Sequence, residues 1–174
     1  SNAWHLLWCE AVGADAAAGV ARTLIGRGLN SGWGVRTLGA DHPSFHPVSY
    51  HRGSVWPHDT MMAIGGLLRY GLVDEAHHLI GGLMAAASHF SFRLPELFSG
   101  VARSEIPSPV RYPTSSSPQA WAAAVPVSLV EELLGVRPDA RAGVLALSPR
   151  LPTGVTLELG GLSIAGGVVS VRAE

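Results

Sequence analysis

The chain has 174 residues, of which 47% are hydrophobic, enough to form the core of one domain or a large part of a bigger one. Its 12 basic and 13 acidic side chains leave a formal charge of −1, which excludes a strong field for nucleic acid or acidic lipid. The single cysteine, Cys9, excludes an intramolecular disulfide. We therefore expect neither a nucleic-acid nor a membrane partner.

The first three residues, Ser-Asn-Ala, resemble the remnant of a cleaved affinity tag, and the residues after them read as the middle of a longer protein. No charged segment followed by an apolar run, the pattern of a signal peptide, is visible at the start. A cytoplasmic location is the default expectation.

Apolar residues at helical spacing, followed by Gly26 and Gly28, predict a first helix over residues 14–26. Residues 29–56 then carry many Gly, Pro, Ser and aromatic residues without a sustained period. Such a long loop is uncommon inside a compact domain unless it has a function. A functional site is therefore first sought in this loop.

Pro57 suits the first turn of a helix that Gly71 ends, and a second helix is predicted over about residues 73–90. The short glycine turn between them predicts an antiparallel helical hairpin. A second polar, proline-rich loop spans residues 93–117. Long polar loops thus alternate with short turns, the pattern of helical hairpins packed side by side in a toroid.

Ser117 before Pro118 predicts the N-cap and first turn of a last helix, with a kink or break at Pro126 and an end at Gly135. Short alternating runs then predict a small antiparallel β module. The predicted fold is mainly α: a partial helical toroid over residues 4–140, after the tag remnant at 1–3, and a β tail over 141–174.

The stretch YHRGSVWPHD, residues 50–59, gathers aromatic, basic and acidic side chains. Aromatic planes fit the C–H face of a sugar, while Arg, Asp and His fit its hydroxyl groups. The first loop therefore predicts a pocket for a polyhydroxylated ligand, lined by Trp33, Arg36, Tyr50, His51, Trp56, His58 and Asp59. On these residues alone, however, core packing of the aromatic rings and capping of the helix start remain the preferred interpretation.

In the second loop, Glu96 lies between Pro95 and Leu97. A carboxylate so placed is partly desolvated, which suits it to accept a proton from water, although a surface glutamate in a turn is an equal alternative. Gln119 and Trp121 come after this loop and are placed to face the same opening. They complete the set of candidate binding residues.

Four histidines fall between residues 42 and 58, but without the tight pairs that zinc sites usually use. No serine lies in a nucleophile motif, and no glycine-rich phosphate loop is present. We predict neither a metal nor a cofactor.

Three segments in this order, SGWGVRTLGADHPSFHPVSYHRGSVWPHD, RLPELFSG and YPTSSSPQAWAAAVPVSLVEELLGVRPDA, resemble the C-terminal part of bacterial amylo-α-1,6-glucosidases, which are glycogen debranching enzyme-like proteins. The resemblance covers nearly the whole chain after the tag remnant. It implies a six-hairpin, (α/α)6-toroid glycoside hydrolase that cleaves α-glucosidic bonds in glucans or oligosaccharides with inversion. Glu96 then resembles the general base, and the aromatic loop resembles the lining of the substrate pocket.

The resemblance also implies a general acid on an earlier hairpin, so we expect the chain alone to be inactive. Apolar helix faces deprived of their neighbours should make it self-associate. Two alternatives remain: a non-catalytic carbohydrate-binding or assembly module, and a purely structural helical domain.

Overall fold

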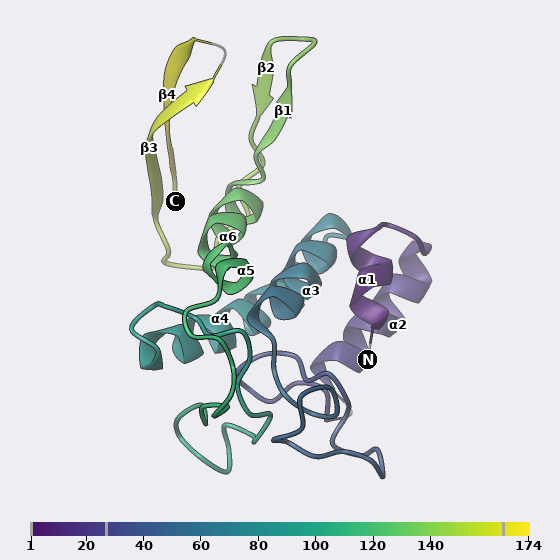
Figure 1. The fold of residues 1–174 in the computed structure, drawn as a ribbon. Coiled ribbons are helices and arrows are strands. Elements are labelled where there is room, and N and C mark those ends of the chain that lie inside the picture. Colours follow the sequence, from purple (N-terminus) through teal and green to yellow (C-terminus); the bar gives the residue numbers. More distant parts are fainter. Residues whose placement is uncertain (1, 27, 165) are drawn as a thin grey trace. The chain divides into compact units, whose positions relative to one another are not determined.

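The computed structural model describes residues 2–26, 28–164 and 166–174, so Ser1 of the predicted tag remnant lies outside the described residues. The chain divides into two compact units, Ser1–Val125 and Pro126–Glu174. The helices of the first unit are α1 (Ala3–Trp8), α2 (Ala14–Ile25), α3 (Pro57–Arg69), α4 (Val73–His89) and α5 (Ala120–Ala123), as Figure 1 shows. Helix α6 (Val125–Leu134) leads into the second unit.

Helix α3 is the central helix of the first unit and is buried on nearly every face. Pro57 occupies its first turn, and Asp59 in that turn complements the positive end of the helix dipole. The helix packs against α1, α4 and α5. Gly66 permits the close approach of α1, because a Cβ there would lie only 2.7 Å from the Leu7 Cβ and 2.8 Å from the Trp8 nitrogen.

The helices predicted over 14–26, 57–71 and 73–90 are confirmed, with ends that differ by one or two residues. Gly71 adopts a φ of 73° in the turn between α3 and α4, a conformation that favours glycine, and the two helices pack together as the predicted hairpin. These three helices form much of the first unit.

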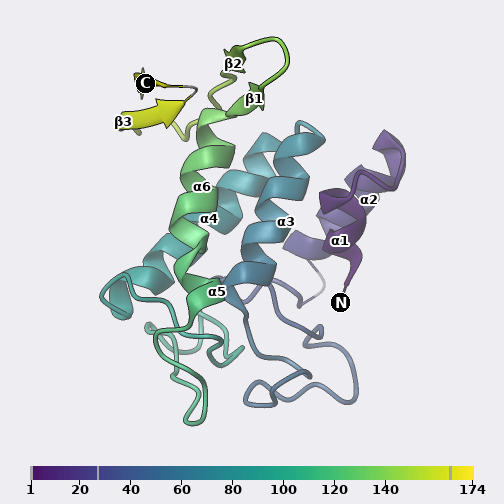
Figure 2. The same cartoon turned by 45° about the horizontal axis from the view of Figure 1, so that its top comes forward.

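The two long loops lie together at one end of these helices, and the short turns lie at the other end (Figure 2). Single β-bridges tie the loops to each other: Val55 pairs with Arg36 and with Phe98, and Phe98 pairs with Arg111. Gly100 N–H donates to the Pro47 carbonyl at 2.8 Å. A Cβ on Gly100 would overlap the carbonyl oxygen of Gly53, so the two loops touch backbone to backbone.

The last helix begins later than predicted, and the expectation that Ser117 caps it is wrong. Gln119 is the N-cap: its side-chain oxygen accepts the Ala122 N–H at 2.9 Å. The helix is then interrupted at Ala124, so that α5 and α6 are separate. Pro126 accounts for this break, because it has no N–H and its ring displaces the carbonyl four residues earlier.

The second unit consists of most of α6 and two antiparallel hairpins. Strand β1 (Arg137–Asp139) pairs with β2 (Val144–Ala146), and β3 (Leu157–Ile164) pairs with β4 (Gly167–Ala173) around a bulge between Leu159 and Leu162. Its core gathers Leu134, Val171 and Ala173 with the partly buried Val130, Val136, Leu151, Leu157, Leu159 and Val169. The mainly α fold class with a small C-terminal antiparallel β module is confirmed, although the strands begin at Arg137.

In the part of the chain that the structure describes, no helix is both long enough and apolar enough to cross a bilayer.

Candidate active site

Aromatic side chains of both long loops form a connected cluster around Tyr50. Three rings meet the Tyr50 ring edge-on, with centroids 4.6, 4.8 and 6.0 Å away: His51, Trp56 and Tyr112. His51 also stacks on Trp56, with 5.5 Å between centroids and 10° between planes. The Trp56 indole N–H donates to the Tyr50 carbonyl oxygen at 3.1 Å, so the Trp56 side chain holds the backbone of its own loop at Tyr50.

The N-terminus of α3 places His58 beside this cluster. Its imidazole meets the edge of Trp56 at 5.4 Å and stacks on Trp121 of α5, with 4.1 Å between centroids and 15° between planes. His58 is 6% exposed, whereas Trp121 is 60% exposed. One face of the indole is therefore covered by His58, and much of the rest of the side chain is accessible to solvent.

Glu96 of the second loop joins the cluster through Tyr50. The Tyr50 hydroxyl donates to Glu96 Oε1 at 2.5 Å, and the Ser116 N–H lies 3.4 Å from Oε2. The Glu96 N–H in turn donates to the Ser116 carbonyl at 2.8 Å. The predicted general base is thus half-buried and held by residues of both long loops.

A hollow of about 360 Å³ opens beside these residues. It is lined by Asn2, Thr37, His51, Trp56, His58 and Asp59. Aromatic rings and polar groups thus meet in a space that falls within the range of small-ligand pockets. Glu96 does not line this hollow, but its negative charge is near enough to His58 to act on the imidazole pKa.

Burial governs the protonation of the two groups at the start of α3. It lowers the pKa of His58, although the nearby carboxylates of Asp59 and Glu96 oppose this shift. Burial likewise raises the pKa of Asp59, against the effect of His58, His5 and His51. His58 Nδ1 is buried and has no hydrogen-bond partner among the described residues. We conclude that the imidazole is neutral at physiological pH.

Two predicted binding residues lie outside the cluster and in the core. Trp33 is 1% exposed and packs against His89 and the guanidinium of Arg103. Arg36 is 5% exposed and donates to the carbonyls of Gly28 at 2.5 Å, Asn30 at 3.3 Å and Gly100 at 2.7 Å. Burial lowers the pKa of Arg36, and Glu105 opposes the shift. Both side chains hold the loops in place.

The remaining predicted residues are brought together: Tyr50, His51, Trp56, His58, Asp59, Glu96 and Trp121. Gln119 stands immediately before α5, but its amide oxygen is occupied by the helix cap. Sequence reasoning missed Tyr112 and Ser116, which contact Tyr50 and Glu96, and it missed Thr37 at the hollow. An aromatic residue inside the polar segment RYPTSSS was a signal for Tyr112, whereas nothing local distinguished Ser116 or Thr37.

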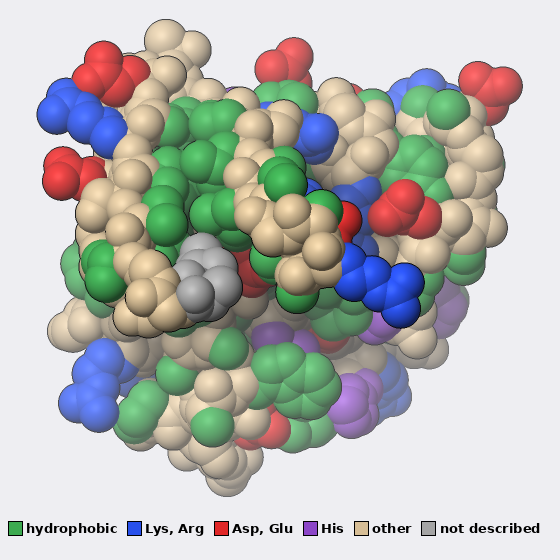
Figure 3. Space-filling view, turned by 90° about the horizontal axis from the view of Figure 1, so that it is seen from above, with side chains coloured by type: hydrophobic (Ala, Val, Ile, Leu, Met, Phe, Trp, Pro, Cys, Tyr) green, Lys and Arg blue, Asp and Glu red, His purple; other side chains and the backbone are tan. Residues whose placement is uncertain are grey.

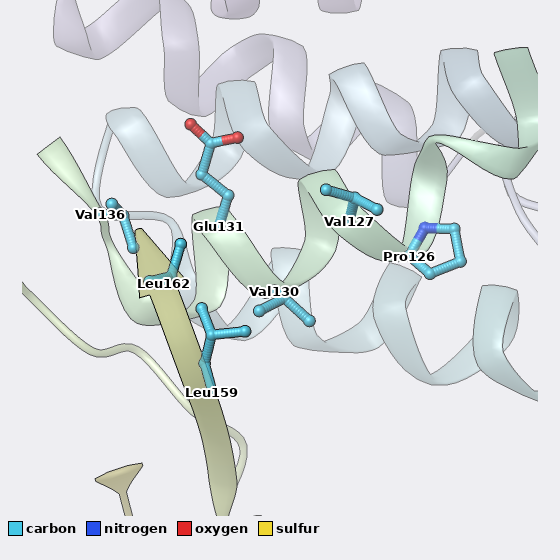
Figure 4. A pocket seen from close by; sticks show the side chains of 7 residues that line it. All are labelled: Pro126, Val127, Val130, Glu131, Val136, Leu159 and Leu162. Atoms are coloured by element: carbon cyan, nitrogen blue, oxygen red, sulfur yellow. The ribbon is translucent and has the colours of Figure 1, made fainter. Parts of the chain in front are cut away.

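A second hollow, of about 470 Å³, lies within the second unit between α6 and β3 (Figure 4). Its lining is Pro126, Val127, Val130, Val136, Leu159 and Leu162, with Glu131 as the charged member. It is larger than the hollow beside His58, but it offers almost no groups for sugar hydroxyls. Figure 3 shows hydrophobic side chains at the surface on the side of the two hairpins. We therefore place the candidate active site in the first unit.

Across residues 2–26, 28–164 and 166–174, no group of three or more His, Cys, Asp or Glu side chains is positioned to hold a metal ion.

Comparison with protein families matches residues 5–93 to the family described as mannosylglycerate hydrolase MGH1-like glycoside hydrolase domain. This match covers just over half of the chain and includes the aromatic loop, but it ends before Glu96. None of the curated proteins compared with the chain matches it. The family supports the broader part of the resemblance, a glycoside hydrolase of the six-hairpin type, and not the amylo-α-1,6-glucosidase assignment. The chain belongs to the MGH1-like glycoside hydrolase domain family.

Proposed function

We propose that the chain forms the C-terminal part of a glycoside hydrolase that cleaves α-glucosidic bonds in glucans or oligosaccharides with inversion, and that Glu96 is its general base. The observation that carries this proposal is the placement of the Glu96 carboxylate beside the aromatic cluster, with Tyr50 Oη 2.5 Å from Oε1. A carboxylate held beside an aromatic cluster in this way supports a role in accepting a proton from a water molecule.

In this mechanism the water loses its proton to Glu96 while its oxygen attacks the anomeric carbon, and the leaving oxygen takes a proton from a general acid. An inverting pair stands roughly 6.5–9.5 Å apart, which leaves room for the water. We assign the acid to an earlier hairpin, as the resemblance implies, and Asp59 to binding. The chain alone should then bind a sugar without hydrolysing it.

The binding surface would consist of the aromatic and polar groups gathered at the start of α3. Trp56 and the exposed Trp121 offer planes for sugar C–H faces, while His51, His58 and Asp59 offer hydrogen-bonding groups. A non-catalytic carbohydrate-binding module would use the same surface. The role of Glu96 separates the two proposals.

The family description favours a second candidate substrate, because it names a mannosylglycerate hydrolase. Hydrolysis of isomaltose, maltotriose and mannosylglycerate by the protein that contains this chain and its upstream hairpins would discriminate between the two. Turnover of isomaltose supports a debranching-type specificity, whereas turnover of mannosylglycerate alone would overturn the α-glucosidase proposal.

The decisive variant is Glu96→Gln in that same longer protein, which keeps the shape of the side chain but removes the base. We expect kcat to fall by about 10²-fold or more while the affinity for ligand is retained. Glu105→Gln is the matched control, since Glu105 is an exposed carboxylate of the same loop. Unchanged turnover in Glu96→Gln, with bound sugar still detectable, would favour the non-catalytic module.

Two further proposals concern the surroundings of the protein. We propose that the isolated chain self-associates through exposed apolar helix faces, since Val127 of α6 is 70% exposed and lines an apolar hollow. We also propose a cytoplasmic location, which fractionation of the native host would test.

A further inference from the structure

The Glu96 carboxylate makes two unequal contacts. Oε1 receives the Tyr50 hydroxyl at 2.5 Å, a short charge-assisted hydrogen bond, whereas the Ser116 N–H approaches Oε2 only to 3.4 Å. The two contacts come from different loops. Oε1 is therefore occupied by a strong hydrogen bond, whereas Oε2 is free to accept a proton.

Tyr50 is itself held in place on several sides. Its carbonyl oxygen accepts the Ser54 hydroxyl at 2.6 Å and the Trp56 indole N–H at 3.1 Å. Its ring is bounded by His51, Trp56 and Tyr112. The backbone contacts fix the loop at Tyr50, while the three ring contacts and the hydrogen bond to Glu96 restrict a side chain that has only two torsions and is 36% exposed. The Tyr50 side chain is thus restrained and can orient the Glu96 carboxylate.

We propose that Tyr50 is a positioning residue for Glu96: it fixes Oε1 so that Oε2 faces the attacking water and takes its proton. This inference rests on the proposed function and changes the expected role of Tyr50, which the sequence predicted to line a sugar pocket. The Tyr50 hydroxyl has only one proton, and that proton is donated to Glu96. Its main contribution is therefore made through the carboxylate.

The pKa of Tyr50 supports this geometry. The hydrogen bond to Glu96 raises it above the ordinary value of 10.0, and burial, the Glu96 charge and Tyr112 add to the shift. The hydroxyl thus remains protonated, and able to donate, over the whole range in which a glycosidase works.

Tyr50→Phe removes the hydroxyl and keeps the ring with its three aromatic contacts, so the fold should survive. In the protein with its upstream hairpins we expect kcat to fall roughly 10- to 100-fold while KM stays within about twofold, because the base is disordered but the sugar contacts remain. Tyr70→Phe is the matched control, since it removes a tyrosine hydroxyl that donates to the Val12 carbonyl, outside the aromatic cluster. A raised KM with unchanged kcat in Tyr50→Phe would make Tyr50 a substrate ligand and overturn the proposal.

A second measurement needs no catalysis. The chain has 3 tyrosines, so Cζ-labelled tyrosine gives separable NMR signals that Phe variants assign. We expect the Tyr50 pKa to fall toward 10.0 in Glu96→Gln, because the charged hydrogen-bond partner is lost. An unchanged Tyr50 titration would overturn the positioning role. If the titration shifts as expected and the longer protein hydrolyses no glycoside, the hydrogen bond stands, but the proposed function falls and the catalytic role of Tyr50 falls with it.

Discussion

The imidazole of His58 lies face to face with the indole of Trp121, with 4.1 Å between ring centroids and 15° between planes. This contact joins the first turn of α3 to α5 and covers a histidine that is only 6% exposed. Because burial is the main cause of the lowered His58 pKa, Trp121→Ala should raise that pKa toward 6.5. NMR titration of the His58 ring protons measures the change. Phe92→Ala, which removes another exposed aromatic residue, should leave the His58 titration as it is.

The same histidine should make stability depend on pH. Since the folded pKa of His58 lies below its unfolded value of 6.5, the unfolded chain binds a proton first as the pH falls below that value. The contribution of His58 is thus fully present above pH 6.5 and is progressively lost as the pH falls toward the folded pKa. Asp59, whose pKa is raised, acts in the opposite direction as the pH falls toward 3.8.

His58→Gln should therefore flatten the loss of unfolding free energy just below pH 6.5, as measured by urea unfolding at several pH values. If the variant and the wild type keep the same slope in this range, the burial of a neutral His58 is refuted.

Arg36 ties the two loops by donating to the buried carbonyl of Gly100 and to the part-buried carbonyls of Gly28 and Asn30. Arg36→Leu leaves these acceptors without their donor, so we expect a loss of about 3 kcal/mol in unfolding free energy. Arg52→Leu removes an exposed guanidinium from the same loop and should change stability by less than about 0.5 kcal/mol. Equal effects in urea unfolding would contradict the structural role of Arg36.

Adjacent glycines in α4 provide a matched pair. A Cβ on Gly81 meets nothing within 4 Å, whereas one on Gly82 would lie 2.8 Å from the Gly32 carbonyl oxygen. Gly81→Ala should stabilise the chain by roughly 0.5–1 kcal/mol, because alanine is the better helix former. Gly82→Ala should destabilise the chain by about 1–3 kcal/mol, because the first loop would have to move away from the added methyl group at Gly32. Thermal unfolding of the two variants decides whether α4 and the first loop pack this closely.

The proposed self-association makes a separate prediction. Val127→Asp places a charge on the apolar surface of α6 and should shift the sedimentation coefficient of the isolated chain toward that of a monomer. Val144→Asp, at an exposed position of β2 outside the apolar hollow, is the control. A wild-type chain that sediments as a monomer at all concentrations would reject the proposal.

Local rules predicted α2, α3 and α4 because their signals are strong and independent. The proline at the start of α3, the glycine after it and apolar residues at helical spacing all agree. The rule failed at Ser117, where a serine before a proline suggested a cap. Gln119 supplies the cap instead, because its amide oxygen reaches the Ala122 N–H.

The site was only partly predictable, because similar residues in one loop have opposite environments. Trp33 and Trp56 both lie in a glycine-rich aromatic segment, yet the first is 1% exposed and packed under Arg103, while the second borders the hollow. The hydrogen bond from Tyr50 to Glu96 spans 46 residues. A pairing over that distance depends on how the two loops fold against each other, which no local spacing records.

The contact of Gly53 with Gly100 has a consequence for protein engineering. Since a side chain on Gly100 would overlap the Gly53 carbonyl, each loop is shaped to the bare backbone of the other. Grafting only the aromatic loop onto another scaffold would transfer the rings without Glu96, which belongs to the second loop. The two loops should therefore be grafted together, and libraries that diversify one loop should keep Gly53 and Gly100 constant.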